Sequence, residues 1–302
     1  MGVTVSAVVP TLGRSPWLLS CLEALRREGA EVIVVDQGET PVELPAGLAD
    51  RVLRPGRNAG FAGGTNLGIA SLSETSAELV ATVNDDALVE PGWTAALGAA
   101  LESDPRVGAA QGVNLMMDDP DRLDGGGISW NRWWQAVQIG HGRPAPAASE
   151  PVREIFGVSA TAALFRRAAL RAVALDGDVF DPRLISYYED VELAGRLRAA
   201  GWRSLLVPAA RARHAGSATG GTMSRERWRL TYGNRWLAAA RLLGRGLWPR
   251  LPWMLLRDVL DLRIPGRAGG IAAGWVRAAR ELPRFAHAGP PAVPVREIVR
   301  FG

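Results

Sequence analysis

Short apolar runs alternate with helix-like segments through the first two-thirds of this chain, and this alternation constrains the fold more than any other feature. The apolar runs are rich in β-branched residues and nearly continuous, which is typical of strands buried on both faces. The expected strands are residues 3–10, 31–36, 51–55, 78–85, 154–165 and 204–215. Expected helices lie between them at residues 15–29, 61–73, 90–104 and 187–202. The pattern predicts an α/β fold with a Rossmann-like, mainly parallel sheet flanked by helices.

The signals for the first helix are specific. Ser15 is the expected N-cap, Pro16 fits the first helical position, and Gly29 is expected to end the helix. Two regions, residues 118–150 and residues 223–302, break the alternation of strands and helices. Residues 118–150 are rich in Gly, Pro and Trp and predict an irregular insertion over the edge of the sheet. We therefore expect a domain at 1–222 and a helical, basic region at 223–302.

Charge is distributed unevenly along the chain. The net charge is +4, yet residues 203–302 carry 18 arginines and 5 acidic side chains, a net +13. Such a region favours an anionic partner, either a membrane surface or a nucleic acid. The alternative is a solvated face in a chain that uses Arg in place of Lys.

Several features bear on location. Cys21 is the only cysteine, which excludes an internal disulfide, and no Cys/His cluster indicates structural zinc. The first residues lack the pattern of a signal peptide, and no apolar run reaches the roughly 20 residues of a membrane span. We expect a cytoplasmic protein, with attachment to the inner face of the plasma membrane as an option.

Polar residues stand where the expected strands end. In parallel α/β sheets, ligands bind beyond the carboxyl ends of the strands. A single polar residue there is usually a turn or cap, but three successive strand ends together indicate a site. These residues are Thr11, Asp36, Asn84, Asp85 and Asp86, and Pro10 ends the first strand beside Thr11.

Three further segments carry candidate residues. The stretch RNAGFAGGTNLG, residues 57–68, could present backbone N–H groups to an anion, although it matches no phosphate-loop pattern. Glu189 and Asp190 begin a helix, where they either complement the helix dipole or supply a general base. His214 ends a strand and becomes a metal-ligand candidate if it lies beside Asp86, in which case Mn²⁺ or Mg²⁺ is expected.

In this order and at these spacings, the motifs resemble family 2 glycosyltransferases of the GT-A fold, within them the bacterial rhamnosyltransferase-like group. The resemblance runs from about residue 3 to residue 222. It rests on VVPTLGR, VVDQGE, NAGFAGGTNLG with VNDDALVEPGW, and FDPRLISYYEDVELAGRLRAAGWRSLLVPAARARHAGSAT.

The resemblance implies a role for each candidate residue. Asp36 would read the nucleotide base, with Pro10 and Thr11 beside the nucleoside. Asn84 stands where many members have Asp, so it would contact sugar or ribose and not the metal. The remaining donor-binding candidates are Arg57, Asn58, Gly60, Asn66 and Asp85; the metal ligands would be Asp86 and His214; the catalytic residues would be Asp190 as base and its neighbour Glu189.

The implied reaction is an inverting transfer of a sugar, with rhamnose as one candidate, from a dTDP-, UDP- or GDP-linked donor to a glycan or lipid-linked acceptor. One alternative is a sugar nucleotidyltransferase, but the first strand lacks the Gly-rich basic signature of that class. Another is an inactive protein of the same fold that binds nucleotides or glycans.

The tail segment LWPRLPWMLLRDVLDLRIPGR mixes Trp, Leu and Arg in the manner of an interfacial segment. We expect it to meet an anionic membrane or, alternatively, to pack on the first domain or in a homodimer. No nucleic acid is expected, because RERWRLTYGNRW fits no reader motif. Trp130, Trp133 and Trp134 predict either an acceptor platform or core packing.

Overall fold

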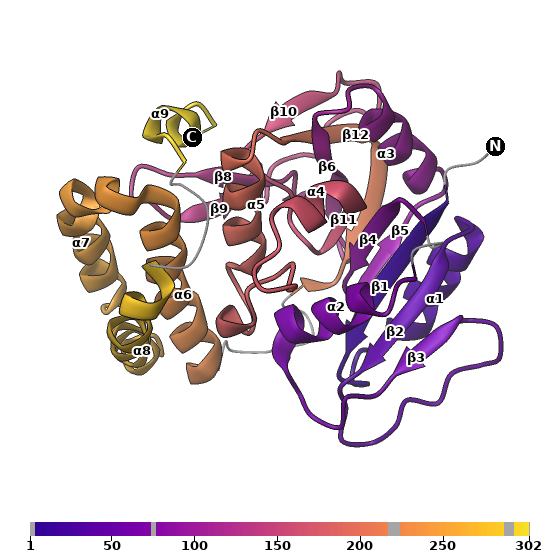
Figure 1. The fold of residues 1–302 in the computed structure, drawn as a ribbon, viewed down its shortest axis with the longest axis horizontal. Coiled ribbons are helices and arrows are strands. Elements are labelled where there is room, and N and C mark those ends of the chain that lie inside the picture. Colours follow the sequence, from indigo (N-terminus) through magenta and orange to yellow (C-terminus); the bar gives the residue numbers. More distant parts are fainter. Residues whose placement is uncertain (1–3, 74–76, 217–223, 287–292, 302) are drawn as a thin grey trace.

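The computed structural model describes residues 4–73, 77–216, 224–286 and 293–301 (Figure 1). Its main sheet has the strand order β10-β12-β6-β11-β4-β1-β2-β3, with β5 on β12 and β7 on β6. The strands are β1 (Val5–Thr11), β2 (Glu31–Asp36), β3 (Arg51–Leu53), β4 (Leu79–Val83), β5 (Ala87–Val89), β6 (Val107–Met116), β7 (Leu123–Gly125), β10 (Arg153–Ile155), β11 (Ala162–Arg166) and β12 (Arg203–His214).

Parallel pairing brings the strand ends together, as predicted. β3, β2, β1 and β4 run parallel, and β12 runs parallel to β6. β11 lies antiparallel between β4 and β6 and joins the two groups. The carboxyl ends of β1 and β4 therefore meet at one edge of the sheet.

Helices cover both faces because the strand residues alternate between two cores. On β1, Val5, Ala7 and Val9 join one core, whereas Val8 joins the other. The first core receives α1 (Leu18–Arg27) and α3 (Trp93–Glu102); the second receives α2 (Gly60–Ala70), α4 (Arg167–Ala172) and α5 (Glu189–Ala199). The predicted α/β class is confirmed.

The start of α1 differs from the prediction. Its N-cap is Trp17, not Ser15, and the helix begins at Leu18 and not at Pro16. The Ser15 hydroxyl accepts the N–H of Trp17 at 3.2 Å and donates to the carbonyl of Asp85 at 3.0 Å. Ser15 therefore fastens the chain to the end of β4 instead of capping the helix.

Strand β6 lies in the middle of the sheet although its sequence, VGAAQGVNLM, gave no strand signal. Small residues explain both facts. A Cβ at position 112 would lie 2.2 Å from the carbonyl oxygen of Ala210, so the close approach of β12 requires glycine there. Such residues have low strand propensity, and tertiary packing decides their conformation.

Residues 118–150 are less irregular than predicted. They contain β7, which pairs with β6, and a separate hairpin of β8 (Ile128–Trp130) and β9 (Ala136–Gln138). Three-residue strands are too short to show a period of two. Trp130 is buried and packs edge-on against Phe156, so it belongs to the core, and Trp133 contacts Trp253 of the C-terminal region.

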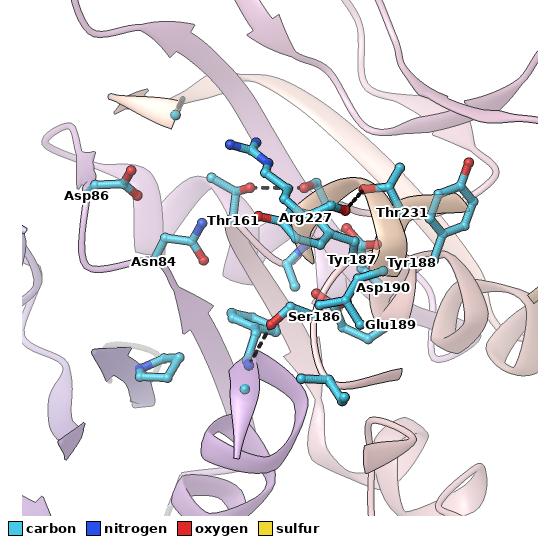
Figure 2. A pocket seen from close by; sticks show the side chains of 18 of the residues that line it. Asn84, Asp86, Thr161, Ser186, Tyr187, Tyr188, Glu189, Asp190, Arg227 and Thr231 are labelled. Carbon is cyan, nitrogen blue, oxygen red and sulfur yellow. Dashed lines mark hydrogen bonds between the residues drawn. The ribbon is translucent and has the colours of Figure 1, made fainter. Parts of the chain in front are cut away.

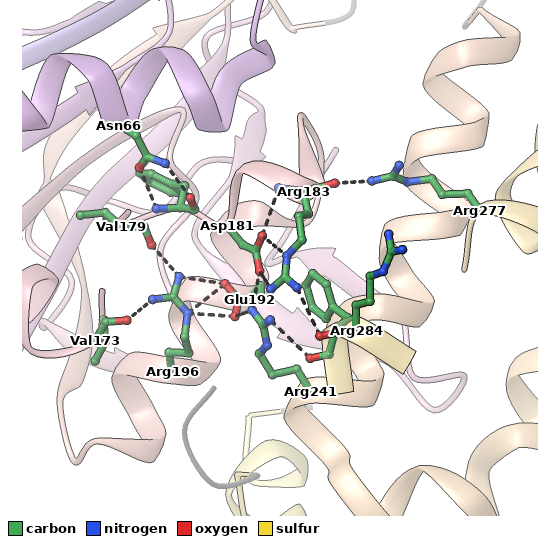
Figure 3. Close-up of polar contacts among 12 residues, drawn as sticks. Asn66, Val173, Val179, Asp181, Arg183, Glu192, Arg196, Arg241, Arg277 and Arg284 are labelled. Atoms are coloured by element: carbon green, nitrogen blue, oxygen red, sulfur yellow. Dashed lines mark hydrogen bonds and ion pairs between the residues drawn. The ribbon is translucent and has the colours of Figure 1, made fainter. Parts of the chain in front are cut away.

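The C-terminal region is helical, as predicted, with α6 (Arg225–Leu243), a 3₁₀ segment η3 (Gly244–Arg250), α7 (Leu251–Asp261), α8 (Ala268–Ala286) and α9 (Val295–Val299). Buried ion pairs fasten α6 to the α/β part (Figure 3). Arg241 of α6 lies 2.9 Å from Asp181 and 2.5 Å from Glu192, and Glu192 also pairs with Arg196 at 2.8 Å. In the parts of the chain that the structure covers, no helix has the length and apolar character to cross a bilayer.

Candidate active site

A cavity of about 970 Å³ opens at the carboxyl ends of β1 and β4 (Figure 2). Its walls come from these strand ends, the start of α2, residues 159–161, the loop before α5, the end of β12 and the first turns of α6. The cavity thus collects side chains that are far apart in sequence. The helical region supplies one wall through Arg227, Leu230 and Thr231.

The end of β4 is organised by hydrogen bonds. Thr11 donates through Oγ1 to Asp85 Oδ2 at 2.6 Å, which ties the end of β1 to the turn after β4. Burial raises the pKa of Asp85 to about 6; the Thr11 hydrogen bond opposes this rise and the nearby Asp86 adds to it. Asp85 is therefore held by the protein scaffold, while Asp86 faces the end of β12.

His214 lies between two carboxylates. Its Nε2 is 3.2 Å from Asp86 Oδ1, and its Nδ1 is 2.8 Å from Asp124 Oδ2. Burial lowers the pKa of the ring, but the hydrogen bonds to Asp124 and Asp86 outweigh it and raise the pKa to about 9. The ring orientation is fixed, with one nitrogen on Asp124 and the other toward Asp86 in the cavity.

This arrangement fits a divalent cation that takes its remaining ligands from outside the protein. A metal-binding histidine usually gives its second nitrogen to a carboxylate, as His214 does to Asp124. Within the described residues, no group of three or more His, Cys, Asp or Glu side chains could enclose an ion. Asp86 and His214 would supply two ligands, and Mg²⁺ or Mn²⁺ commonly takes others from phosphates and water.

Glu189 and Asp190 begin α5 on another wall. Asp190 accepts the N–H of Val191 at 2.8 Å and that of Ala160 at 3.4 Å. Burial raises its pKa, and these hydrogen bonds limit the rise. Glu189 is 7% exposed, and burial, with the charge of Asp190, raises its pKa well above the usual value. The pair therefore holds one charge more readily than two, and the N–H groups of Val191 and Ala160 favour the charge on Asp190.

The sequence profile of Glycosyl transferase family 2 matches residues 6–173. The chain belongs to glycosyltransferase family 2. Over 227 residues this glycosyltransferase is 29% identical to the N-acetylglucosaminyl-diphospho-decaprenol L-rhamnosyltransferase of Mycobacterium tuberculosis (strain CDC 1551 / Oshkosh), covering 65% of this chain and 70% of that enzyme. A shorter match, 33% over 95 residues, is to the uncharacterized protein Mb1552 of Mycobacterium bovis, with 32% of this chain and 35% of that protein covered.

Two solved structures share the fold of this glycosyltransferase. GalNAc-T7 with UDP, GalNAc and Mn²⁺ superimposes with a TM-score of 0.63 at 14% identity, covering 96% of this chain and 59% of that one. The mannosyltransferase PcManGT of Pyrobaculum calidifontis, with GDP-Man and Mn²⁺, gives 0.51 at 18% identity, covering 92% and 86%. The predicted GT-A fold is confirmed.

Most of the predicted site residues of this glycosyltransferase line the cavity described above. They are Pro10, Thr11, Asn58, Gly60, Asn84, Asp85, Asp86, Glu189, Asp190 and His214. Asp36, Arg57 and Asn66 are not among the lining residues. Asp36 accepts the N–H groups of Gly38 and Val42 and pairs with Arg54 at 3.2 Å.

The placement of Asn66 differs from the expected contact with the nucleotide. Its amide donates to the carbonyl of Phe180 at 2.7 Å and accepts the N–H of Phe180 at 2.9 Å, and the residue is buried. Asn66 therefore fastens α2 to the segment that leads into α5. Asn66 lies in the middle of α2, where the helix packs on the second core, and not at the start of the helix, which lines the cavity.

Sequence reasoning missed Asp124 and the α6 residues. Asp124 precedes three glycines in the segment DRLDGGGISW, and that acid followed by close-packing glycines was the available signal. The α6 residues gave no signal, because their place at the cavity follows from helix packing alone.

Proposed function

We propose that this glycosyltransferase performs an inverting transfer of a sugar from a nucleoside-diphosphate sugar, with Asp190 as general base and Asp86 and His214 as ligands of Mn²⁺ or Mg²⁺. One observation carries the proposal: Asp86, which contacts His214, and the Glu189–Asp190 pair lie on separate walls of a single cavity (Figure 2). The donor diphosphate and the acceptor hydroxyl can thus approach the sugar from different sides.

The chemistry follows from this placement. A cation at Asp86 and His214 would neutralise charge that develops on the leaving diphosphate. Asn84, beside His214 at 3.5 Å, can hydrogen-bond the sugar or the ribose. Asp190 would accept the proton of the acceptor hydroxyl as that oxygen attacks the anomeric carbon, and the departing diphosphate leaves from the opposite face. One displacement of this kind inverts the configuration.

The names of the relatives support a proposal for the donor and the acceptor. The curated relative is named as an L-rhamnosyltransferase with a decaprenol-linked acceptor, and the structural neighbours contain UDP or GDP-Man with Mn²⁺. For this chain we propose a dTDP-, UDP- or GDP-linked donor, with dTDP-rhamnose first, and a lipid-linked acceptor. Asp36, Arg57 and Asn58 stay as proposed contributors to nucleotide binding.

An outward apolar face supports a place at a membrane. Helix α7 buries acidic side chains and exposes apolar ones. Asp258 and Asp261 are buried, and Asp258 accepts the indole N–H groups of Trp236 and Trp275. The outer side forms what we call the α7 face, made of Trp248, Trp253, Leu255, Leu256, Val259 and Ile264, each more than a third exposed.

Charge complementarity favours anionic lipid as the occupant of the α7 face. Arg245 and Arg263, which lie close in sequence to Trp248 and Ile264 of this face, are exposed. Each arginine near an anionic leaflet contributes about 1 kcal/mol. The same face on a second copy of the chain carries the same positive charges, so it offers no charge complementarity. A lipid-linked acceptor would then be met at the surface where the enzyme binds.

Donor binding and turnover test the function separately. A thermal-shift panel of dTDP-rhamnose, UDP-GalNAc and GDP-mannose with Mn²⁺ should select one donor. Asp86→Ala should abolish the Mn²⁺-dependent part of that shift. Asp190→Asn should keep donor binding and lower release of the nucleoside diphosphate by about 10²-fold or more. Wild-type turnover in Asp190→Asn would remove the base assignment, and binding without turnover in the wild type would favour an inactive protein.

A further inference from the structure

The loop before the Glu189–Asp190 pair has a strained backbone. Ile185, Tyr187 and Tyr188 have φ angles of 65°, 70° and 69°. With ψ of −70° and a 2.7 Å bond from the N–H of Ser186 to the carbonyl of Leu184, Ile185 forms a γ-turn of the rare, strained type. Conformations of this kind cost about 1–3 kcal/mol each and persist only when the surroundings hold them.

Helix α2 holds the loop from one side. The N–H of Ala62 donates to the carbonyl of Ile185 at 3.0 Å, and the N–H of Phe61 donates to Ser186 Oγ at 3.1 Å. A Cβ at position 60 would lie 2.4 Å from the Ile185 oxygen, so Gly60 makes this approach possible. The N–H groups of the first turn of α2 therefore bind the loop.

Helix α6 holds the loop from the other side through one side chain. The Nδ2 of Asn234, which is fully buried, lies 2.6, 2.9 and 2.8 Å from the carbonyl oxygens of Leu184, Ser186 and Tyr187. Arg277 of α8 fixes the amide by donating through Nε to Asn234 Oδ1 at 3.1 Å. Arg277 also donates to the carbonyl of Arg183 (Figure 3).

We propose that Asn234 is a positioning residue, which holds residues 184–187 in the strained form that delivers Asp190 to the cavity. Buried carbonyls that lose their donor cost about 1–3 kcal/mol, comparable with the strain, so the loop would relax without Asn234. The C-terminal helices then help to build the site. The inference rests on the proposed role of Asp190.

Three variants separate positioning from general stability. Asn234→Ala removes the donors. Asn234→Asp keeps the size but cannot donate. Tyr232→Phe, the control on the same helix, deletes a buried 2.8 Å bond to Asp261 and leaves the loop untouched. Both Asn234 variants should lower kcat about 10- to 100-fold with the donor selected from the panel, because small misplacements of catalytic groups have effects of this size. KM and donor affinity should stay unchanged.

Hydrogen exchange gives a readout that needs no substrate. The amides of Phe61 and Ala62 should exchange faster in both Asn234 variants and not in Tyr232→Phe. Adding Ile185→Gly to Asn234→Ala should restore part of kcat, since glycine adopts a positive φ without a Cβ clash.

Wild-type kcat in Asn234→Ala, near-wild-type kcat in Asn234→Asp, or an equal loss in Tyr232→Phe would overturn the inference. If Asp190→Asn is inactive while Asn234→Ala is fully active, only the inference fails. If Asp190→Asn is active, the base assignment itself fails.

Discussion

Asp124 Oδ2 lies 2.8 Å from Nδ1 of His214, while Nε2 of the same ring lies 3.2 Å from Asp86 Oδ1. One carboxylate therefore orients the imidazole and the other shares the cavity with it. Asp124 comes from the β7 strand of a segment that the sequence predicted to be irregular. The relationship separates the proposed metal ligands, Asp86 and His214, from Asp124, the residue that orients one of them.

Asp124→Asn should weaken binding of Mn²⁺ together with the donor by about 10- to 100-fold, because carboxylates that orient metal-binding histidines contribute this much. Isothermal titration of the nucleotide with and without Mn²⁺ measures the change. Asp119→Asn, on the exposed surface of the same segment, is the control. Equal Mn²⁺ dependence in Asp124→Asn and wild type would contradict the orienting role.

Glu189→Gln should stabilise the protein increasingly as pH rises. The pKa of Glu189 is higher in the folded protein than in the unfolded chain, where it is about 4.3. Below the unfolded pKa, Glu189 is protonated in both states and does not reduce the stability of the protein. As the pH rises from there through the folded pKa, the unfolded state gains from ionisation and the folded protein loses stability. Gln imitates the protonated acid at every pH. The difference in Tm between variant and wild type should therefore be small at pH 4 and grow up to pH 8.

Calorimetry over that range checks the prediction, and donor turnover should remain close to wild type because Asp190 carries the charge. A constant Tm difference would show that Glu189 ionises in the fold as it does in the unfolded chain.

Arg241→Leu should destabilise the protein by about 3 kcal/mol, near the lower end of the range for removing one partner of a buried ion pair. Asp181 and Glu192 would stay buried, although Arg183 and Arg196 still pair with them (Figure 3). Urea unfolding followed by circular dichroism gives the free energy of unfolding. Arg229→Leu on the same helix removes a surface pair to Glu226 and should change it by no more than about 1 kcal/mol. Similar losses in both variants would argue against the buried network.

The strand ends were predictable because parallel pairing has one geometric consequence. Any ligand site beyond β1 and β4 must collect Thr11 and the Asn84–Asp86 turn, and it does. Asp190 and His214 were placed by family resemblance and came to the same cavity. Pairing rules and motif order therefore predict that these residues come together, and in the structure they line the same cavity.

Other parts depended on packing between distant segments. β6 is a strand because β12 and Trp202 close over Gly112 and Gly108, a fact absent from its local sequence. Asn66 and Asn234 are both buried amides that bind backbone groups, and nothing in their own helices indicates which loop they meet. The boundary at residue 222 lies outside the described residues and stays a prediction. Composition alone does not show that α6 contacts the loop at residues 184–187 through Asn234.

The α7 face gives the last prediction. The full chain should sediment with vesicles containing phosphatidylglycerol and not with phosphatidylcholine alone, because arginines and exposed tryptophans act together at an anionic interface. The double variant Trp253→Glu, Leu256→Glu should lose this binding and keep donor turnover, since neither side chain lines the cavity. Leu19→Glu, 42% exposed on α1, matches Leu256 in exposure and should still bind. Failure of the full chain to bind would reject the membrane, and a dimer in analytical ultracentrifugation that the double variant abolishes would identify a second copy as the occupant of the α7 face.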